Sequence, residues 1–288
     1  MSDASCRISA LTLYPIKSCA GVPVDEALLI ETGLDLDRAF MVVDEGGQML
    51  TQRQWPRMAL LRPTVRREDM VLRAPGMLTL HVRLDTVEAP TRVQVWRDIV
   101  KAFDMGNLAA QWFSDFLGLR ARLVRFDPEQ QRPSDPRWVG DLTAGTAFAD
   151  GYPLLVCNSA SLADLNARIE AHGASAPAPA IAMQRFRPNL VLDGLHPFDE
   201  DALHELTVST EDGPVVLRLV KPCVRCGIPD VDPEDASVGV EPGATLARFR
   251  SDPRMDGGIT FGVNAVVVEG VDRVLRVGQT VSARFAFD

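Results

Sequence analysis

The sequence predicts a β-dominated α+β protein. Three observations carry this prediction. Most of the apolar residues fall in short runs that alternate with polar residues, which is typical of strands. Turn-forming Gly, Pro, Asn and Asp separate these runs. Only two segments show the longer period of a helix, so helices are expected to be few.

The first third of the chain reads as strands. Residues 7–16 and 24–33 alternate apolar and polar side chains. Residues 38–54 hold two β-rich runs around Asp44-Glu45-Gly46-Gly47, which is a hairpin signal. Many short strands joined by turns predict a small barrel or sandwich. Further β-rich runs cover residues 70–74, 78–84 and 91–96.

A helix is expected at residues 107–117. Leu108, Trp112 and Phe116 recur there at helical spacing, so we expect them on one apolar face. Gly118 is placed to end the helix. Residues 121–126 return to a strand pattern.

The second half begins with a buried strand at residues 151–157. A helix is expected to open at Ser161, because Asp164 three residues later makes a variant of the capping box. Leu162, Leu165 and Ile169 form its apolar stripe, and a low-complexity loop follows at residues 172–180. The remaining strand-like runs are residues 189–194, 203–209, 214–222, 259–269 and 273–285.

The polar, Pro- and Gly-rich stretch 127–146 divides the chain. We therefore expect an N-terminal β-barrel-like domain at residues 1–126, a linker at 127–146 and a second domain at 147–288.

Composition excludes several functions. A net charge of −9 disfavours nucleic acid and anionic membrane surfaces as partners, because both require a basic face. The five cysteines form no secreted framework, so reduced thiols in the cytoplasm are expected. The N-terminus lacks the pattern of a signal peptide, and no apolar run reaches the roughly 18 residues of a membrane span.

Cys223-Val224-Arg225-Cys226 is the most informative tetrapeptide. Arg225 and nearby Lys221 would favour thiolate over thiol. Buried structural cysteines remain possible, since free Cys is often buried. Zinc would require two further ligands, and a thioredoxin-like dithiol would require a helix after the pair. The fourth interpretation is a single thiolate bound to a molybdenum centre.

Ten short motifs occur in one order along the chain. They are YPIKSCAG (14–21), GL (33–34), DR (37–38), LTQRQ (50–54), AFADGYPLL (147–155), SLADLN (161–166), RFRPN (185–189), KPCVRC (221–226), VDP (231–233) and FGVN (261–264). Together these motifs resemble the MOSC-domain family with its N-terminal β-barrel domain. In layout the chain is most similar to the bacterial and mitochondrial amidoxime-reducing molybdoproteins. The resemblance implies that the second domain is a MOSC β-barrel.

The resemblance also implies a molybdenum–molybdopterin cofactor between the domains, with the first ~40 residues of the chain contributing to the site. The metal ligand and catalytic residue would be Cys226, with Cys223 as the fallback choice. The implied activity is two-electron reduction of N-hydroxylated compounds, such as amidoximes and N-hydroxylated bases. The cofactor carries that chemistry and the protein positions it.

The expected cofactor-binding residues suit an anionic ligand. Guanidinium groups bind phosphate with two parallel hydrogen bonds, and hydroxyl, amide and backbone groups can hold the pterin. Asn158 stands where relatives usually have Ser. The full expected set is Lys17, Ser18, Arg38, Arg53, Asn158, Ser159, Arg187, Asn189, Val224, Arg225 and Asn264.

The chain departs from some relatives. No cysteine follows Cys226, so we expect no built-in iron–sulfur cluster and a separate redox protein as electron donor. The membrane-anchored leader of the mitochondrial relatives is absent, so we expect no membrane association. Residues 234–243 form a longer and more acidic stretch than the family pattern predicts.

Two other functions remain open. The protein could be a cofactor carrier or a sulfur-transfer protein, in which a cysteine holds a persulfide. It could also be a metal-free module that binds a small molecule.

Overall fold

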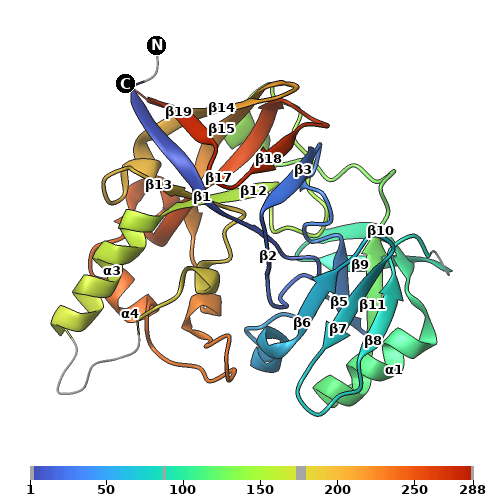
Figure 1. The fold of residues 1–288 in the computed structure, drawn as a ribbon. Coiled ribbons are helices and arrows are strands. Elements are labelled where there is room, and N and C mark those ends of the chain that lie inside the picture. The colour runs from blue at the N-terminus through green and yellow to red at the C-terminus, as the bar shows by residue number, and fades with distance from the viewer. Residues whose placement is uncertain (1–2, 87–88, 173–179, 287–288) are drawn as a thin grey trace.

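The computed structural model describes residues 3–86, 89–172 and 180–286, which form a larger barrel lobe and a smaller second lobe (Figure 1). The predicted β-dominated α+β class is confirmed. Most of the low-complexity loop expected at residues 172–180 lies outside the described residues.

Seven strands close the barrel, because β17 pairs with β12 at the two ends of the hydrogen-bonded order. The pair β12–β13 is parallel and the pair β12–β17 is antiparallel. In spatial order the strands are β12 (Leu154–Asn158), β13 (Leu190–Asp193), β1 (Ala4–Leu13), β19 (Thr280–Phe285), β14 (Leu203–Thr210), β15 (Gly213–Val224) and β17 (Gly258–Glu269).

The first strand of the chain lies inside this barrel. β1 pairs with β13 on one side and with β19 on the other. Its alternation, shifted by an irregularity between Ile8 and Ala10, places Ile8 and Leu11 in a core shared with residues from the C-terminal half. Residues 4–13 and 22–34 therefore belong to the barrel lobe. The barrel's accessory strands are β2 (Val22–Val24), β3 (Glu26–Ile30), β4 (Gly33–Leu34), β16 (Ser251–Asp252) and β18 (Val274–Arg276).

The second lobe contains two small antiparallel sheets and one long helix, α1 (Gly106–Leu117), which packs against β11. Its four-stranded sheet has the order β5 (Phe40–Asp44), β11 (Ala121–Phe126), β10 (Asp98–Asp104) and β9 (Ala89–Val95). Its three-stranded sheet has the order β6 (Arg62–Val65), β7 (Asp69–Arg73) and β8 (Leu80–Arg83). The other helices are α2 (Pro136–Val139), α3 (Ser159–His172) and α4 (Gly243–Leu246), and the 3-10 turns are η1 (Pro56–Leu60), η2 (Met183–Phe186), η3 (Asp199–Ala202), η4 (Ile228–Asp230) and η5 (Pro253–Met255).

The helix predicted at residues 107–117 is confirmed, and Gly118 ends it in the left-handed conformation with φ of 74°. The placement of Leu108 on its apolar face was wrong, because Leu108 is 73% exposed. Trp112 and Phe116 are buried as predicted, and Ala109 and Phe113 are buried with them. The buried face therefore follows three- and four-residue spacings rather than spacings of four alone.

Helix α3 begins at Ser159, two residues before the predicted start. The Ser161 hydroxyl does not cap it, and the prediction of a capping box was wrong. Instead Asn158 Oδ1 accepts a hydrogen bond from Ala160 N at 3.1 Å, which is the geometry of an Asn at the N-cap.

Residues 14–21 reach from β1 to the second lobe and return to β2, and residues 35–40 and 127–153 cross between the lobes. Backbone hydrogen bonds join the first two, from Phe40 N to Pro15 O at 2.9 Å and from Lys17 N to Phe40 O at 2.8 Å. The predicted linker at 127–146 contains α2 and the buried Arg132. These crossings bring polar side chains to the boundary between the lobes.

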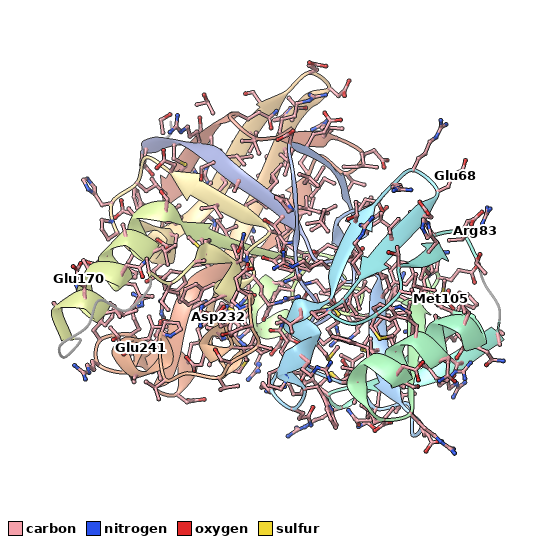
Figure 2. The ribbon with its side chains drawn as sticks, turned by 60° about the horizontal axis from the view of Figure 1, so that its bottom comes forward. Glu68, Arg83, Met105, Glu170, Asp232 and Glu241 are labelled. Atoms are coloured by element: carbon pink, nitrogen blue, oxygen red, sulfur yellow. The ribbon has the colours of Figure 1, made fainter. Side chains whose placement is uncertain are left out.

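An ion pair between Arg62 on β6 and Glu234 joins the lobes across their boundary at 2.7 Å. Figure 2 shows Glu68 and Glu170 at opposite ends of the molecule, with Asp232 between them. No helix in the described part of the chain is both long and apolar enough to span a bilayer.

Gly262 permits the close approach of β17 to β12. Its φ is +73°, and a Cβ there would lie 2.6 Å from Cys157 Sγ and 2.8 Å from Val156 O. We expect Gly262→Ala to lower the free energy of unfolding by about 3 kcal/mol, from positive-φ strain plus overpacking. Urea denaturation followed by circular dichroism measures this change.

Gly118→Ala is the matched control, because Gly118 has a similar φ of +74° and a Cβ there would meet nothing within 4 Å. We expect a loss of only about 1 kcal/mol for this variant. Equal losses for the two variants would contradict the proposed close contact.

Candidate anion-binding and thiol site

A cavity of about 290 Å³ lies at the boundary between the lobes. This volume is near the lower limit of about 300 Å³ for small-molecule pockets. The cavity brings together all of the predicted site residues except Asn158 and Ser159. The predicted residues that line it are Lys17, Ser18, Arg38, Arg53, Arg187, Asn189, Cys223, Val224, Arg225, Cys226 and Asn264.

The cavity is strongly cationic although the chain is acidic. Six cationic side chains line it, and Asp150 is the single carboxylate among the described lining residues. The cations are Lys17, Arg38, Arg53, Arg187, Lys221 and Arg225. Such an excess of donors suits a ligand with more than one negative charge.

Arg187 is the most constrained of these cations. Its Nη1 donates to Cys19 O at 2.5 Å, whereas Nη2 is buried and has no partner among the described atoms. Burial, together with the charge of Arg38, lowers the pKa of Arg187 to about 10. A buried guanidinium with an unsatisfied donor is costly unless an acceptor binds there.

Arg38 lies beside Arg187, and both guanidinium groups stack on the ring of Tyr14, at 4.3 and 4.2 Å from its centroid. Arg38 Nη1 donates to Asp37 Oδ2 at 2.6 Å and to Asn189 Oδ1 at 3.2 Å. Arg38 Nη2 donates to Arg187 O at 3.1 Å. These contacts hold two like charges close together.

Asn189 connects several elements of the site. It is buried, and its Oδ1 also accepts from Leu155 N at 3.1 Å on β12. Its Nδ2 donates to Thr12 O at 3.3 Å on β1. In the structure Asn189 therefore fixes Arg38 against two barrel strands rather than pointing a free amide into the cavity.

Lys17 forms an ion pair with Asp150 across the lobe boundary. Lys17 Nζ donates to Asp150 Oδ1 at 2.5 Å and to Phe148 O at 2.8 Å. Burial lowers the pKa of Lys17 despite this pairing. Burial alone would raise the pKa of Asp150, but the charge and hydrogen bond of Lys17 outweigh it and hold that pKa well below its usual range. The Asp150 carboxylate is thus ionised at neutral pH.

Two of the five cysteines are available at the cavity. Cys226 is exposed and Cys223 is half-buried. Arg225 Nη1 donates to Cys223 Sγ at 3.0 Å, and no hydrogen bond engages Cys226 Sγ among the described residues. Burial raises the pKa of Cys6 to about 11 and that of Cys19 to about 12. Burial also raises the pKa of Cys157 well above its usual value, so only the 223/226 pair can supply a reactive thiolate.

The backbone around the cavity is strained. Four lining residues that are not Gly have positive φ: Ser18 at 65°, Arg38 at 49°, Trp96 at 55° and Arg187 at 60°. Each such residue costs free energy, and such residues tend to cluster at functional sites. Three of these four residues, Ser18, Arg38 and Arg187, are among the predicted site residues.

The other predicted residues that line the cavity contribute less directly. Arg53 is exposed, and its guanidinium lies 4.5 Å from the ring centroid of Trp96. Val224 is 47% exposed at the rim. Asn264 Nδ2 donates to Lys221 O at 3.1 Å, so Asn264 orients the strand that carries Lys221.

Asn158 and Ser159 lie at the far end of β12, roughly 13 Å of strand from its cavity-lining start. Asn158 caps α3, and its Nδ2 donates to His196 O at 2.7 Å. Ser159 Oγ donates to Asp193 Oδ1 at 2.8 Å. The structure does not bring these two predicted residues to the cavity, because both serve the start of the helix.

Several lining residues were not predicted as site residues. Asp150, Trp96 and Tyr152 line the cavity, although sequence analysis gave them no role in the site. Behind them Arg132 is buried, and it donates to Ala149 O and to Asp150 O, which fixes the Asp150 loop. Asp150 lies within the AFADGYPLL motif and is its single acidic residue. That acidic residue was the signal from which a role for Asp150 in the site could have been predicted.

No group of three or more His, Cys, Asp or Glu side chains that could hold a metal ion occurs among the described residues. A metal held at Cys226 would therefore need most of its ligands from a bound molecule.

Comparisons with known proteins agree with this arrangement. The model of the MOSC N-terminal beta barrel domain matches residues 5–120, and the model of the MOSC domain matches residues 144–282. The chain is 36% identical over 253 residues to mitochondrial amidoxime reducing component 2 of Bos taurus, which covers 84% of this chain and 72% of the relative. It is 35% identical over 254 residues to mitochondrial amidoxime-reducing component 1 of Homo sapiens, with 84% and 72% covered. It is 28% identical over 238 residues to the molybdenum cofactor sulfurase of Homo sapiens, with 78% of this chain but 26% of the relative covered.

The unpaired donor of Arg187 predicts anion binding. In protein freed of small molecules, inorganic phosphate should raise the melting temperature. At a phosphate concentration of 100 times its Kd, binding should add about 2.7 kcal/mol to the free energy of unfolding. Arg187→Met should abolish this rise. It should also leave the free energy of unfolding without phosphate no lower than that of the wild type, because a buried cation with a lowered pKa costs stability at neutral pH. Differential scanning calorimetry measures both effects.

Arg120→Met is the control, because Arg120 forms an exposed ion pair with Glu45 away from the cavity. A phosphate response that survives in Arg187→Met, or one that is lost in Arg120→Met, would refute the assignment.

Glu200 predicts a pH dependence of stability. It is fully buried near the start of α3, Oε2 accepts from Ser161 Oγ at 2.7 Å, and Oε1 has no partner among the described atoms. Burial raises the pKa of Glu200 to about 7. The folded state thus binds this proton more tightly than the unfolded state, and the resulting stability is lost as pH rises from about 4.5 through 7.

Glu200→Gln should remove this dependence. Relative to the variant, the wild type should lose on the order of 2–3 kcal/mol between pH 5 and pH 8. Urea denaturation at a series of pH values checks this, and parallel curves for the two proteins would show that Glu200 is ionised when folded.

Proposed function

Because the chain belongs to the family of MOSC-domain proteins that carry a MOSC N-terminal β-barrel domain, we propose that it is a molybdenum-cofactor-dependent reductase of N-hydroxylated compounds. Amidoximes and N-hydroxylated bases are the proposed substrates. One observation carries the proposal: the thiol of Cys226 and Nη2 of Arg187, both without a hydrogen bond among the described residues, line the same cavity.

The residues present fit a molybdopterin. Its phosphate dianion requires several donors in a fixed arrangement. Arg187 offers a buried Nη2 without a partner among the described atoms, and Arg38 and Lys17 add charge to the same cavity. Ser18 also lines it. The assignment of these residues to the phosphate and pterin is part of the proposal.

Cys226 is the proposed metal ligand. A thiolate is a soft ligand that suits a metal already held by the sulfur atoms of a dithiolene. Cys226 Sγ is free of hydrogen bonds among the described residues, whereas Cys223 Sγ accepts one from Arg225. Cys223 remains the fallback ligand.

When bound, the cofactor would supply the two electrons that cleave the N–O bond. The overall change consumes two electrons and two protons and releases the amidine and one water. Asp150 is the protein group best placed to hold the substrate, because its carboxylate is ionised, its side chain is 69% exposed and it lines the cavity. With its depressed pKa it accepts a hydrogen bond from a substrate N–H rather than donating a proton.

A separate redox protein is the proposed electron donor. Three of the five cysteines are buried and the other two line the cavity, which leaves no four-cysteine set for an iron–sulfur cluster within these residues. All five are free thiols, which supports a reducing compartment such as the cytoplasm.

A cofactor carrier or sulfur-transfer protein is the second candidate. The half-buried Cys223 beside Arg225 favours it, since a neighbouring cation stabilises a thiolate that could hold a persulfide. We rank it lower because the matched molybdenum cofactor sulfurase extends well beyond this chain, which covers 26% of it. A metal-free binding module is the third candidate, and metal analysis of the purified protein tests it.

Cys226→Ala tests the function directly. We expect molybdenum, measured by inductively coupled plasma mass spectrometry, to fall at least about 10-fold, because one ligand contributes at least 1.4 kcal/mol. Reduction of benzamidoxime with reduced methyl viologen as donor should disappear. Cys223→Ala is the matched control and should keep most of the metal and activity.

The outcomes separate the candidates. Molybdenum without benzamidoxime reduction in the wild type would favour the carrier function. Full metal and activity in Cys226→Ala would refute the ligand assignment, and their loss in Cys223→Ala alone would transfer it to the fallback residue.

A further inference from the structure

Trp96 occupies an unusual place in the cavity wall. It is the first of the two residues that turn from β9 to β10, since Val95 pairs with Asp98 across the hairpin. Its φ is +55°, and the next residue, Arg97, is not among those with positive φ. This is the pattern of a type II′ turn, in which Gly normally fills the first position. A bulky aromatic residue there costs stability.

The neighbouring side chains hold the indole in a fixed orientation. Trp96 Nε1 donates to Asp150 Oδ1 at 3.0 Å. The guanidinium of Arg53 lies over the ring at 4.5 Å from its centroid. Gln94 Nε2 donates to Trp96 O at 2.8 Å, which fixes the turn itself.

The ring nevertheless stays accessible. Trp96 is 40% exposed and lines the cavity although one side is stacked against Arg53. A polar or small residue would satisfy the turn at lower cost, so packing of the protein does not account for the indole. A rigid, partly exposed aromatic surface in a pocket is suited to stacking against a flat ligand.

We propose that Trp96 is a specificity-determining residue that stacks on planar, conjugated substrates. This inference rests on the proposed reductase function. Aromatic amidoximes and N-hydroxylated heterocyclic bases would lie against the indole, and saturated substrates of the same size would not. Asp150 Oδ1 already accepts from Lys17 and Trp96, which leaves Oδ2 of the same carboxylate for an N–H of the ligand.

A matched pair of substrates tests the proposal. Benzamidoxime and cyclohexanecarboxamidoxime carry the same reactive group on six-membered rings that differ in planarity. With the cofactor-loaded protein, Trp96→Gly should raise KM for benzamidoxime by about 3- to 10-fold, with little change in kcat. KM for the cyclohexane compound should change less than about 2-fold.

Two further variants distinguish stacking of Trp96 on the substrate from a purely structural role of Trp96 in the cavity wall. Trp96→Phe keeps a planar ring but loses the hydrogen bond to Asp150, and it should preserve the preference for benzamidoxime. Arg97→Ala, on the same turn and outside the cavity lining, should leave both KM values unchanged. Because Gly suits the turn, the melting temperature of Trp96→Gly should fall by no more than about 2 °C.

Binding without turnover gives an independent measurement. By isothermal titration calorimetry, the wild type should bind benzamidine more tightly than cyclohexanecarboxamidine, and Trp96→Gly should remove the difference. This binding pattern together with no reduction of either amidoxime would refute the reductase function and leave the stacking role. Reduction of both amidoximes with equal KM, or equal KM increases for both in Trp96→Gly, would overturn the stacking role and leave the reductase.

Discussion

The arrangement of this protein depends on holding like charges together at the boundary of its two lobes. Arg38 and Arg187 share one tyrosine ring, and Asp37 is the one carboxylate that contacts either guanidinium among the described residues. Their mutual repulsion is offset by the Tyr14 ring, by Asn189 and by backbone carbonyls such as Cys19 O. A low-dielectric site with donors already in place binds an anion without further rearrangement, which is the advantage of preorganisation.

The topology explains why these charges meet. The barrel takes its first strands from residues 4–34 and the rest from residues 154–285, so the chain must leave it and return. Each crossing is irregular backbone, which is where a fold can place side chains without disturbing a strand ladder. Lys17 lies on the 14–21 segment, and Arg38 and Asp150 lie on the two crossings, so the Lys17–Asp150 ion pair joins segments more than a hundred residues apart in sequence.

Much of the fold and part of the site could be predicted from the sequence. Alternating patterns predicted the strands, and motif order predicted residues such as Arg187 and Cys226, which the cavity brings together. The pairing of β1 with β19 could not be predicted, because alternation specifies a buried face and not a partner. Asn158 was expected to bind the cofactor, but it caps α3 instead. An Asn amide can serve either role, and only the direction in which β12 runs decides which of the two it serves. Trp96 was interpreted as a core or interface residue, because the role proposed for it depends on a backbone conformation that its residue type disfavours.

The position of β1 also sets an order for biosynthesis. Ala4 pairs with Ala283, and the barrel places this first strand between β13 and β19. A nascent chain emerging from the ribosome must therefore keep its opening segment unpaired on one side until the last strand has been translated. The smaller lobe, whose sheets use residues 40–126, can form during that interval. The ligand cavity then comes into existence only with the final strands, so an unfinished chain offers no completed pocket in which a ligand could be trapped.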